Sequence, residues 1–148
     1  MPEKETIERA QKDAKEGKSP STQAGEFVRE EMDHIREGKH GARSTKQAIA
    51  IGLSKARRAG VKLAAPKKGK VSEEMRRKAK REVANAKQGR RAPSPRRSRA
   101  IEAALRREGR GAASPEALSR HAKSSARKRS AASRSRSAKQ AARTRGSK

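Results

Sequence analysis

The sequence has no cysteine, no tryptophan and no tyrosine, and Phe27 is its only aromatic residue. The absence of cysteine excludes disulfides and thiolate chemistry, although it is neutral about compartment. The shortage of aromatic rings argues against single-stranded nucleic acid as a ligand, because proteins commonly stack single-stranded bases on aromatic side chains. Nothing resembles a secretion signal, and no apolar run approaches the roughly 18 residues of a membrane span. We therefore expect a cytoplasmic protein with no membrane partner.

Large apolar side chains are scarce as well. Leu, Ile, Val and Phe together number 14 of 148 residues, and the formal net charge is +26. Such a chain has little apolar surface with which to offset the entropy lost when its backbone is ordered. One large globular domain is therefore not expected, and the composition favours a small folded core with charged flanking segments.

Acidic residues are missing from the C-terminal end of the chain. Residues 1–40 contain 8 Lys or Arg and 10 Asp or Glu, whereas residues 41–148 contain 34 and 6. After Glu116 there are 11 basic residues and no acidic one. This asymmetry predicts that the later part of the chain binds a polyanion.

The clearest helix signals lie between residues 19 and 63. Ser44 and Gln47 have the spacing of a capping box, and Gly60 followed by Val61 is typical of a helix C-terminus. These signals predict a helix at about 44–59, and an amphipathic pattern predicts another at about 21–37, capped by Ser21 or Thr22. We expect the two helices to form a small hairpin of marginal stability, with an apolar interface formed by Phe27, Val28, Met32 and Ile35 on one helix and Ile49, Gly52, Leu53 and Ala56 on the other.

The predicted fold class is therefore all-α, with further short, loosely packed helices at about 3–16, 72–88, 98–108 and 114–126. We expect a charged N-terminal segment at 1–18, the hairpin core at 19–63, a basic linker with short helices at 64–126, and a disordered Ala/Ser/Arg/Lys tail at 127–148. The first of these helices has only a thin apolar stripe, so we expect it to dock weakly.

Candidates for catalysis are weak. Asp33, His34 and His40 are residue types that bind metal ions, but the two histidines fall on different predicted elements, so solvated surface residues are the favoured interpretation. An acidic stripe on the helix at 21–37 is interpreted as a solvated face, because nothing near it in the sequence would desolvate a catalytic carboxylate; its members are Glu26, Glu30, Asp33 and Glu37. We expect no enzymatic activity, no catalytic residues, no metal and no cofactor.

The stretch from Ser44 to Gly60, S-T-K-Q-A-I-A-I-G-L-S-K-A-R-R-A-G, resembles a small bacterial domain of uncharacterised function. The resemblance covers roughly residues 24–62. Its members are commonly labelled DNA-binding proteins, so the resemblance implies nucleic-acid binding without a mechanism or assigned residues. Lys55 stands where many members are expected to have an acid. The tail is similar in composition to bacterial histone-H1-like proteins.

Basic clusters provide the candidate binding residues. Lysine and arginine neutralise phosphates and release condensed counterions, which drives binding that is independent of sequence. The candidate nucleic-acid-binding residues are Lys46, Lys55, Arg57, Arg58, Lys62, Lys67, Lys68, Lys70, Arg90, Arg91, Arg96, Arg97, Arg127, Lys128, Arg129, Arg134, Arg136, Arg143 and Arg145.

The predicted function is sequence-independent binding of double-stranded DNA, in a nucleoid-associated or histone-like protein. Two alternatives stay open. The first alternative is that the chain is an RNA-binding protein. The second is that it is a protein-interaction module whose basic arm only adds affinity. In the second case, the hairpin is expected to form a homodimer through Phe27, Met32, Ile49 and Leu53.

Overall fold

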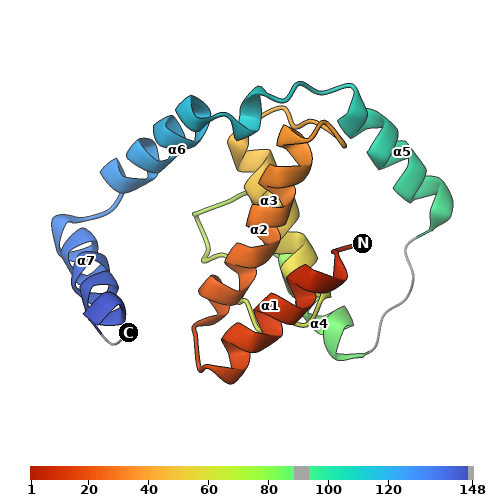
Figure 1. Cartoon of the computed structure of the whole chain (residues 1–148). Coiled ribbons are helices and arrows are strands. Elements are labelled where there is room, and N and C mark those ends of the chain that lie inside the picture. Colours follow the sequence, from red (N-terminus) through yellow and green to blue (C-terminus); the bar gives the residue numbers. More distant parts are fainter. Residues whose placement is uncertain (89–93, 147–148) are drawn as a thin grey trace. The chain divides into compact units, whose positions relative to one another are not determined.

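Every regular element that the structure describes is a helix, so the predicted all-α class is confirmed. The computed structural model describes residues 1–88 and 94–146. Contacts divide the chain into two units, Met1–Ser114 and Pro115–Lys148. The elements, drawn in Figure 1, are α1 (Lys4–Lys15), α2 (Pro20–Arg36), α3 (Thr45–Arg58), α4 (Glu73–Lys87), α5 (Pro95–Arg106), the short 3-10 helix η1 (Gly111–Ala113), α6 (Pro115–Arg127) and α7 (Ala131–Gly146).

Local signals set the ends of the central helices. Ser19, rather than Ser21 or Thr22, caps α2, and Pro20 occupies its first turn, where a missing N–H costs nothing. Ser44 caps α3 by accepting from the Gln47 backbone N–H, as predicted. The Gln47 side chain accepts from the N–H of Arg43, one residue before the cap, at 2.7 Å.

The end of α3 has the predicted stop. Gly60 adopts a positive φ of 96°, which a residue with a Cβ rarely adopts. Its N–H bonds to the Arg57 carbonyl, and the Val61 N–H bonds back to the Ala56 carbonyl. These two bonds make a Schellman motif, and they bring Val61 onto the hydrophobic core.

Helices α2 and α3 form the predicted hairpin and pack backbone to backbone. A Cβ built on Gly52 would lie 2.7 Å from the Val28 Cα and 2.9 Å from its N. The interface is therefore filled largely by small residues, with Ala24, Ala48 and Ala56 fully buried. The large core side chains are Phe27 and Ile35, which expose 1% and 0% of their surface.

Helix α1 docks more closely than its thin apolar stripe predicted. Thr6 and Ala10 are buried against α2, and Ala10 joins the core cluster with Phe27. The contact is reinforced by an ion pair between Arg9 and Glu26 at 2.8 Å. Small side chains at positions four apart allow close approach of the two helices, which a count of large apolar residues does not detect.

Residues 105–113 return to the turn between α2 and α3. Leu105 and Gly109 accept hydrogen bonds from the backbone N–H groups of Gly41 and Ala42. A Cβ at Gly41 would collide with the Glu108 carbonyl, so this turn requires glycine. The Thr45 hydroxyl donates to a carbonyl of η1, whose alanines are buried. The sequence did not predict this long-range contact.

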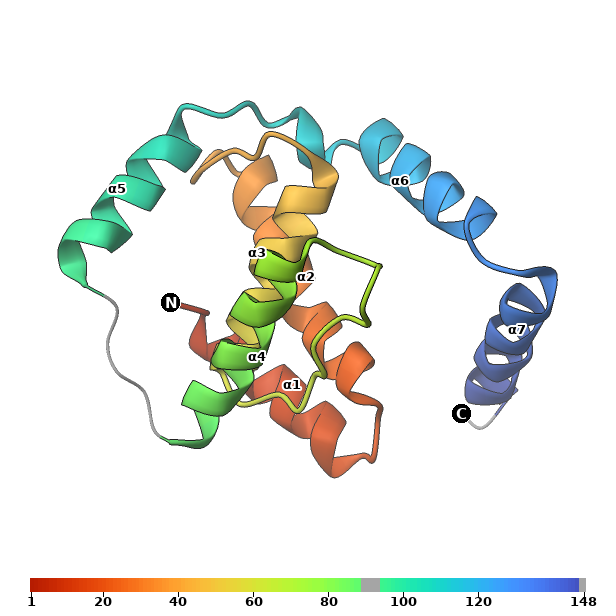
Figure 2. The same cartoon turned by 180° about the vertical axis from the view of Figure 1, so that it is seen from behind.

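Helix α4 packs against α3, as the view from behind in Figure 2 shows. Ala79 is its one buried residue, and Glu82 accepts a hydrogen bond from Ser54 of α3. Helix α5 begins at Pro95, three residues before its predicted start, because Ser94-Pro95 supplies the cap position and the first-turn proline. It has no buried residue.

The second unit contains α6 and α7, and neither helix has a buried residue. The sequence predicted disorder from residue 127 onward, but the structure has helix over Ala131–Gly146. Alanine and arginine are strong helix formers, so the segment can be helical with nothing packed against it. None of the described helices is both long enough and apolar enough to cross a membrane.

The two helical glycines of the hairpin give opposite predictions. We expect Gly52→Ala to lower the free energy of unfolding by about 1–3 kcal/mol, because its methyl group would force α2 and α3 apart. Gly25→Ala in α2 is the control. Its new methyl would meet nothing within 4 Å, so better helix propensity should raise stability by up to about 1 kcal/mol. Urea unfolding followed by circular dichroism measures both, and equal midpoints would contradict the close contact.

Candidate nucleic-acid interface

Lys55, a predicted phosphate ligand, lies inside the first unit. Its Nζ is 3.1 Å from Glu30 Oε1 and 2.7 Å from Glu31 Oε2. Its side chain is 15% exposed, whereas each of the two glutamate side chains is 1% exposed. The charge of Lys55 therefore offsets two buried carboxylates, and it has little reach toward an external phosphate.

Arg57 is also buried and paired within the first unit. Its side chain is 8% exposed, and its Nη1 lies 3.8 Å from Glu82 of α4. Lys55 faces α2 and Arg57 faces α4, although the sequence analysis listed both among the candidate nucleic-acid-binding residues. Among the predicted residues of this region, Lys46, Arg58 and Lys62 are exposed.

Opposing influences act on the pKa of Glu30. Burial by itself would raise the pKa of Glu30, since it removes water from the charged form. Hydrogen bonds from the Glu3 backbone and the Thr6 side chain, together with the charge of Lys55, outweigh burial and hold the pKa below its ordinary value. Glu30 thus ties α1 and α3 to α2 at one point.

The acidic stripe is therefore not the uniformly solvated face that the sequence predicted. Glu30 is buried beneath α1, and Glu26 is paired with Arg9. Asp33 pairs with Arg29 and Arg36 of its own helix, at 4.0 and 3.2 Å. The docking of α1 on this side of α2 accounts for the difference.

The other predicted cations that the structure describes are all exposed. They fall in three groups, the linker after α3, the start of α5, and the second unit. Arg90 and Arg91 lie outside the described residues. The exposed members are Lys67, Lys68 and Lys70, then Arg96 and Arg97, then Arg127, Lys128, Arg129, Arg134, Arg136, Arg143 and Arg145.

Helix α4 provides a basic face that the sequence analysis did not include. Arg77, Lys80 and Arg81 are exposed and line one shallow hollow together with Glu73 and Glu74 of the first turn. Their spacing of three and four residues places them on one side of the helix. This spacing could have predicted the basic face of α4 from the sequence. The face was missed because its residues do not form a large cluster of like charge.

Helices α6 and α7 each present a row of exposed cations. Arg120, Lys123 and Arg127 follow an i, i+3, i+7 pattern on α6, and Arg136, Lys139 and Arg143 follow the same pattern on α7. At 1.5 Å per residue, each row extends about 10 Å along its helix.

Arg134 differs from the rest of this group. Its Nη1 donates to the carbonyls of Ala126 and Arg129, at 3.2 and 3.3 Å, around the end of α6. This contact places a positive charge beside the partial negative charges of carbonyl oxygens near a helix C-terminus, which is favourable.

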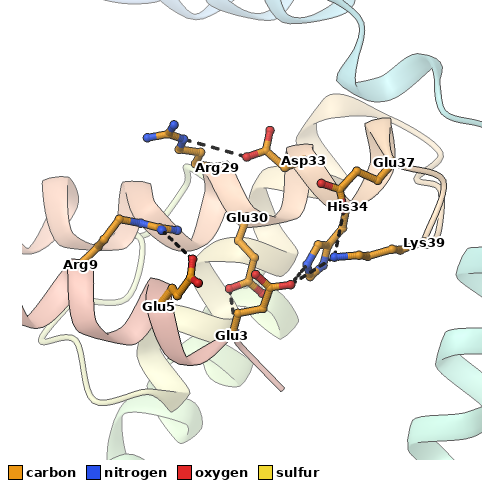
Figure 3. A pocket seen from close by; sticks show the side chains of 9 residues that line it. All are labelled: Glu3, Glu5, Arg9, Arg29, Glu30, Asp33, His34, Glu37 and Lys39. Carbon is orange, nitrogen blue, oxygen red and sulfur yellow. Dashed lines mark hydrogen bonds and ion pairs between the residues drawn. The ribbon is translucent and has the colours of Figure 1, made fainter.

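The two histidines of the hairpin are not the solvated residues that the sequence predicted. Their side chains are 13% and 14% exposed, and their ring centroids lie 5.9 Å apart. Figure 3 shows His34 pointing toward Glu3, whose Oε1 lies 2.8 Å from the His34 Nε2. Hydrogen bonds with His34 and Lys39 hold the pKa of Glu3 below its ordinary value.

The apolar residues predicted to join two copies of the chain are largely used within one copy. Phe27 and Met32 are 1% and 5% exposed, and Leu53 packs against the core cluster. Ile49 is partly buried. A dimer through this face would require the hairpin to open.

Residues 3–69 match a family of unknown function, DUF6496. The match overlaps the stretch that resembles a small domain of uncharacterised function, and it covers α1, α2, α3 and the first part of the following linker. The family description names no activity, so the DNA-binding label stays a prediction. No curated protein and no solved structure matches the chain.

Two lysines of α3 separate a structural role from a surface role. We expect Lys55→Met to lower the free energy of unfolding by about 3 kcal/mol, because it leaves two buried carboxylates without their cation. Lys46→Met, at an exposed position, should change it by no more than about 0.5 kcal/mol. Urea unfolding of the two variants tests this difference. Equal stability of the two would show that the carboxylates do not depend on Lys55.

Proposed function

We propose that this protein binds double-stranded DNA through its phosphates, without base specificity, in a nucleoid-associated or histone-like role. The observation that carries the proposal is the distribution of exposed cations over α6 and α7, in a stretch that has no acidic residue after Glu116. Such a surface attracts a polyanion over long distances, and the counterions it releases on contact drive the binding.

Helical presentation supports contact with a duplex backbone. The row Arg136, Lys139 and Arg143 directs three long cationic side chains from one face of α7. Duplex DNA has one phosphate per about 1.7 Å of helix axis, so a row of about 10 Å passes several phosphates whatever the base sequence. The sequence has one Phe and no Tyr or Trp, and the ring of this Phe27 is buried, so it provides no platform for base stacking.

The first unit contributes differently. Its first 40 residues have a net charge of −2, and its acidic side chains are largely engaged with cations of α1, α2 and α3. Its exposed cations include residues of α3, α4, α5 and the linker after α3. We propose that this unit is a folded anchor that adds a few phosphate contacts, while the second unit supplies most of the affinity.

The salt dependence of binding is the direct test. For full-length protein engaging about six phosphates, we expect affinity for duplex DNA to fall at least about 10³-fold between 50 and 200 mM salt. Gel-shift or fluorescence-anisotropy titrations at several salt concentrations give the slope. The slope should be the same for duplexes of unrelated sequence, and a flat salt dependence would rule out the proposed mechanism.

Matched charge variants locate the binding surface. Neutralising Arg136, Lys139 and Arg143 together with glutamine should reduce the magnitude of the salt slope by about 3, because about one counterion is released per contact. The control replaces Lys4, Lys12 and Lys15 of α1 with glutamine, which removes the same charge from the acidic end of the chain. A control that weakens binding as much as the α7 variant would show that net charge alone matters.

Structured RNA is the competing ligand. Both ligands present phosphates, so the same cations would serve either one. Competition between duplex DNA and a structured RNA of equal length measures the preference. Displacement of bound DNA by an equimolar amount of RNA, with no displacement in the reverse experiment, would replace DNA by RNA in the proposal.

A further inference from the structure

Three ligand-bearing side chains converge where α2 ends and the chain turns toward α3. Glu31 and His34 are three residues apart on α2, so they project from the same face. His40 comes from the loop that follows, after Gly38 has turned the chain with a φ of 78°. One ligand atom from each of the three side chains lies within 4.8 Å of the other two. The Glu31 side chain is 1% exposed, and the two rings are 13% and 14% exposed.

The hydrogen bonding of His40 favours a cation at this point. Its Nδ1 is 3.0 Å from the Gly41 carbonyl, which only accepts, so Nδ1 carries the ring's proton in the neutral form. The Nε2 atom then presents a lone pair, and it lies 3.0 Å from Oε1 of Glu31. Two acceptors at this distance repel unless a proton or a metal cation lies between them.

This arrangement matches the surroundings of metal-binding histidines. Such histidines usually donate their second ring N–H to a backbone carbonyl or a carboxylate, which fixes the tautomer. His40 makes such a bond to Gly41, and His34 has Glu3 within 2.8 Å of its Nε2, which leaves its Nδ1 available. Lys55 holds the Oε2 of Glu31 and leaves Oε1 directed toward His40.

The local charge suits a divalent ion. Four carboxylates and two lysines surround the two rings. With the rings counted as neutral, two negative charges are left uncompensated. The carboxylates are those of Glu3, Glu30, Glu31 and Glu37, and the lysines are Lys39 and Lys55. A polar cavity of about 190 Å³, drawn in Figure 3, has Glu3, His34 and Lys39 in its wall. This cavity provides a path from solvent to the His34 ring.

From this geometry we propose that Glu31, His34 and His40 bind a divalent transition-metal ion of the zinc class. Two imidazole nitrogens and one carboxylate oxygen are a ligand set that Zn²⁺ accepts, with a fourth position for water. Hard cations such as Mg²⁺ prefer oxygen ligands and would bind more weakly. The bound ion would tie the end of α2 to the loop before α3.

The third histidine supplies a matched control for the test. Metal-free full-length protein, titrated with Zn²⁺ in a calorimeter and then analysed for bound zinc after gel filtration, should retain about one ion per chain. We expect His40→Ala to weaken binding at least about tenfold. His121→Ala removes an imidazole from α6, outside the cluster, and should bind zinc as the wild type does.

Further measurements distinguish a lost site from a trivial loss of binding through unfolding. Glu31→Gln keeps the size of the side chain, and circular dichroism shows whether each variant stays helical. Zn²⁺ should raise the midpoint of thermal unfolding of the wild type and of His121→Ala, but not that of His40→Ala. Substitution by Co²⁺ should give the intense visible absorption of a tetrahedral site. Absence of zinc binding by the wild type, or equal losses in the His40 and His121 variants, would overturn the proposal.

Discussion

The close contact between α2 and α3 is the constraint on which the rest of the first unit depends. With 14 Leu, Ile, Val and Phe residues in the whole chain, the protein cannot fill a wide core. Its core is narrow instead. Glycine and alanine lie where α2 and α3 cross, and Phe27 and Ile35 are the main large side chains of the core. Because the backbones are so close, the side chains beside the crossing are desolvated even when they are polar. That geometry, together with the docking of α1, puts Glu30 and Glu31 out of water, and Lys55 is the cation that pairs with both of them.

The same geometry divides the cations of the chain into two populations. Those on α3 that face α2 and α4 balance buried acids, and Lys55 and Arg57 belong to this group. Those on α6 and α7 are exposed, in a stretch that has no acidic residue after Glu116. Equal formal charges therefore have different roles, and only burial distinguishes them. The proposed DNA contacts belong to the second population, whereas the proposed metal site lies among the buried acids of the first unit.

Features that depend on residues close together in the sequence could be predicted, whereas features that depend on distant residues could not. Ser44 with Gln47, and Gly60 with Val61, act within one helix turn, and their helix ends were predicted closely. The burial of Lys55 could not be predicted, because it depends on where α1 and α2 lie in space. The return of residues 105–113 to Gly41 is equally non-local. For the candidate metal site, the residue types were visible, but Asp33 was weighed in place of Glu31, and the loop that brings His40 back to α2 was not foreseen.

Helices α6 and α7 have no buried residue, and this has a consequence for how their sequence can change. A helix that packs against nothing places no demand on the order of its residues beyond helix propensity and the spacing of its charges. Many permutations of the same Ala, Ser, Arg and Lys would serve as well, so drift should erase residue identity there while composition persists. At the α2–α3 crossing, in contrast, a single added methyl group changes the distance between two backbones. The structure of the α2–α3 hairpin thus depends on the order of its residues, whereas that of α6 and α7 depends mainly on their composition.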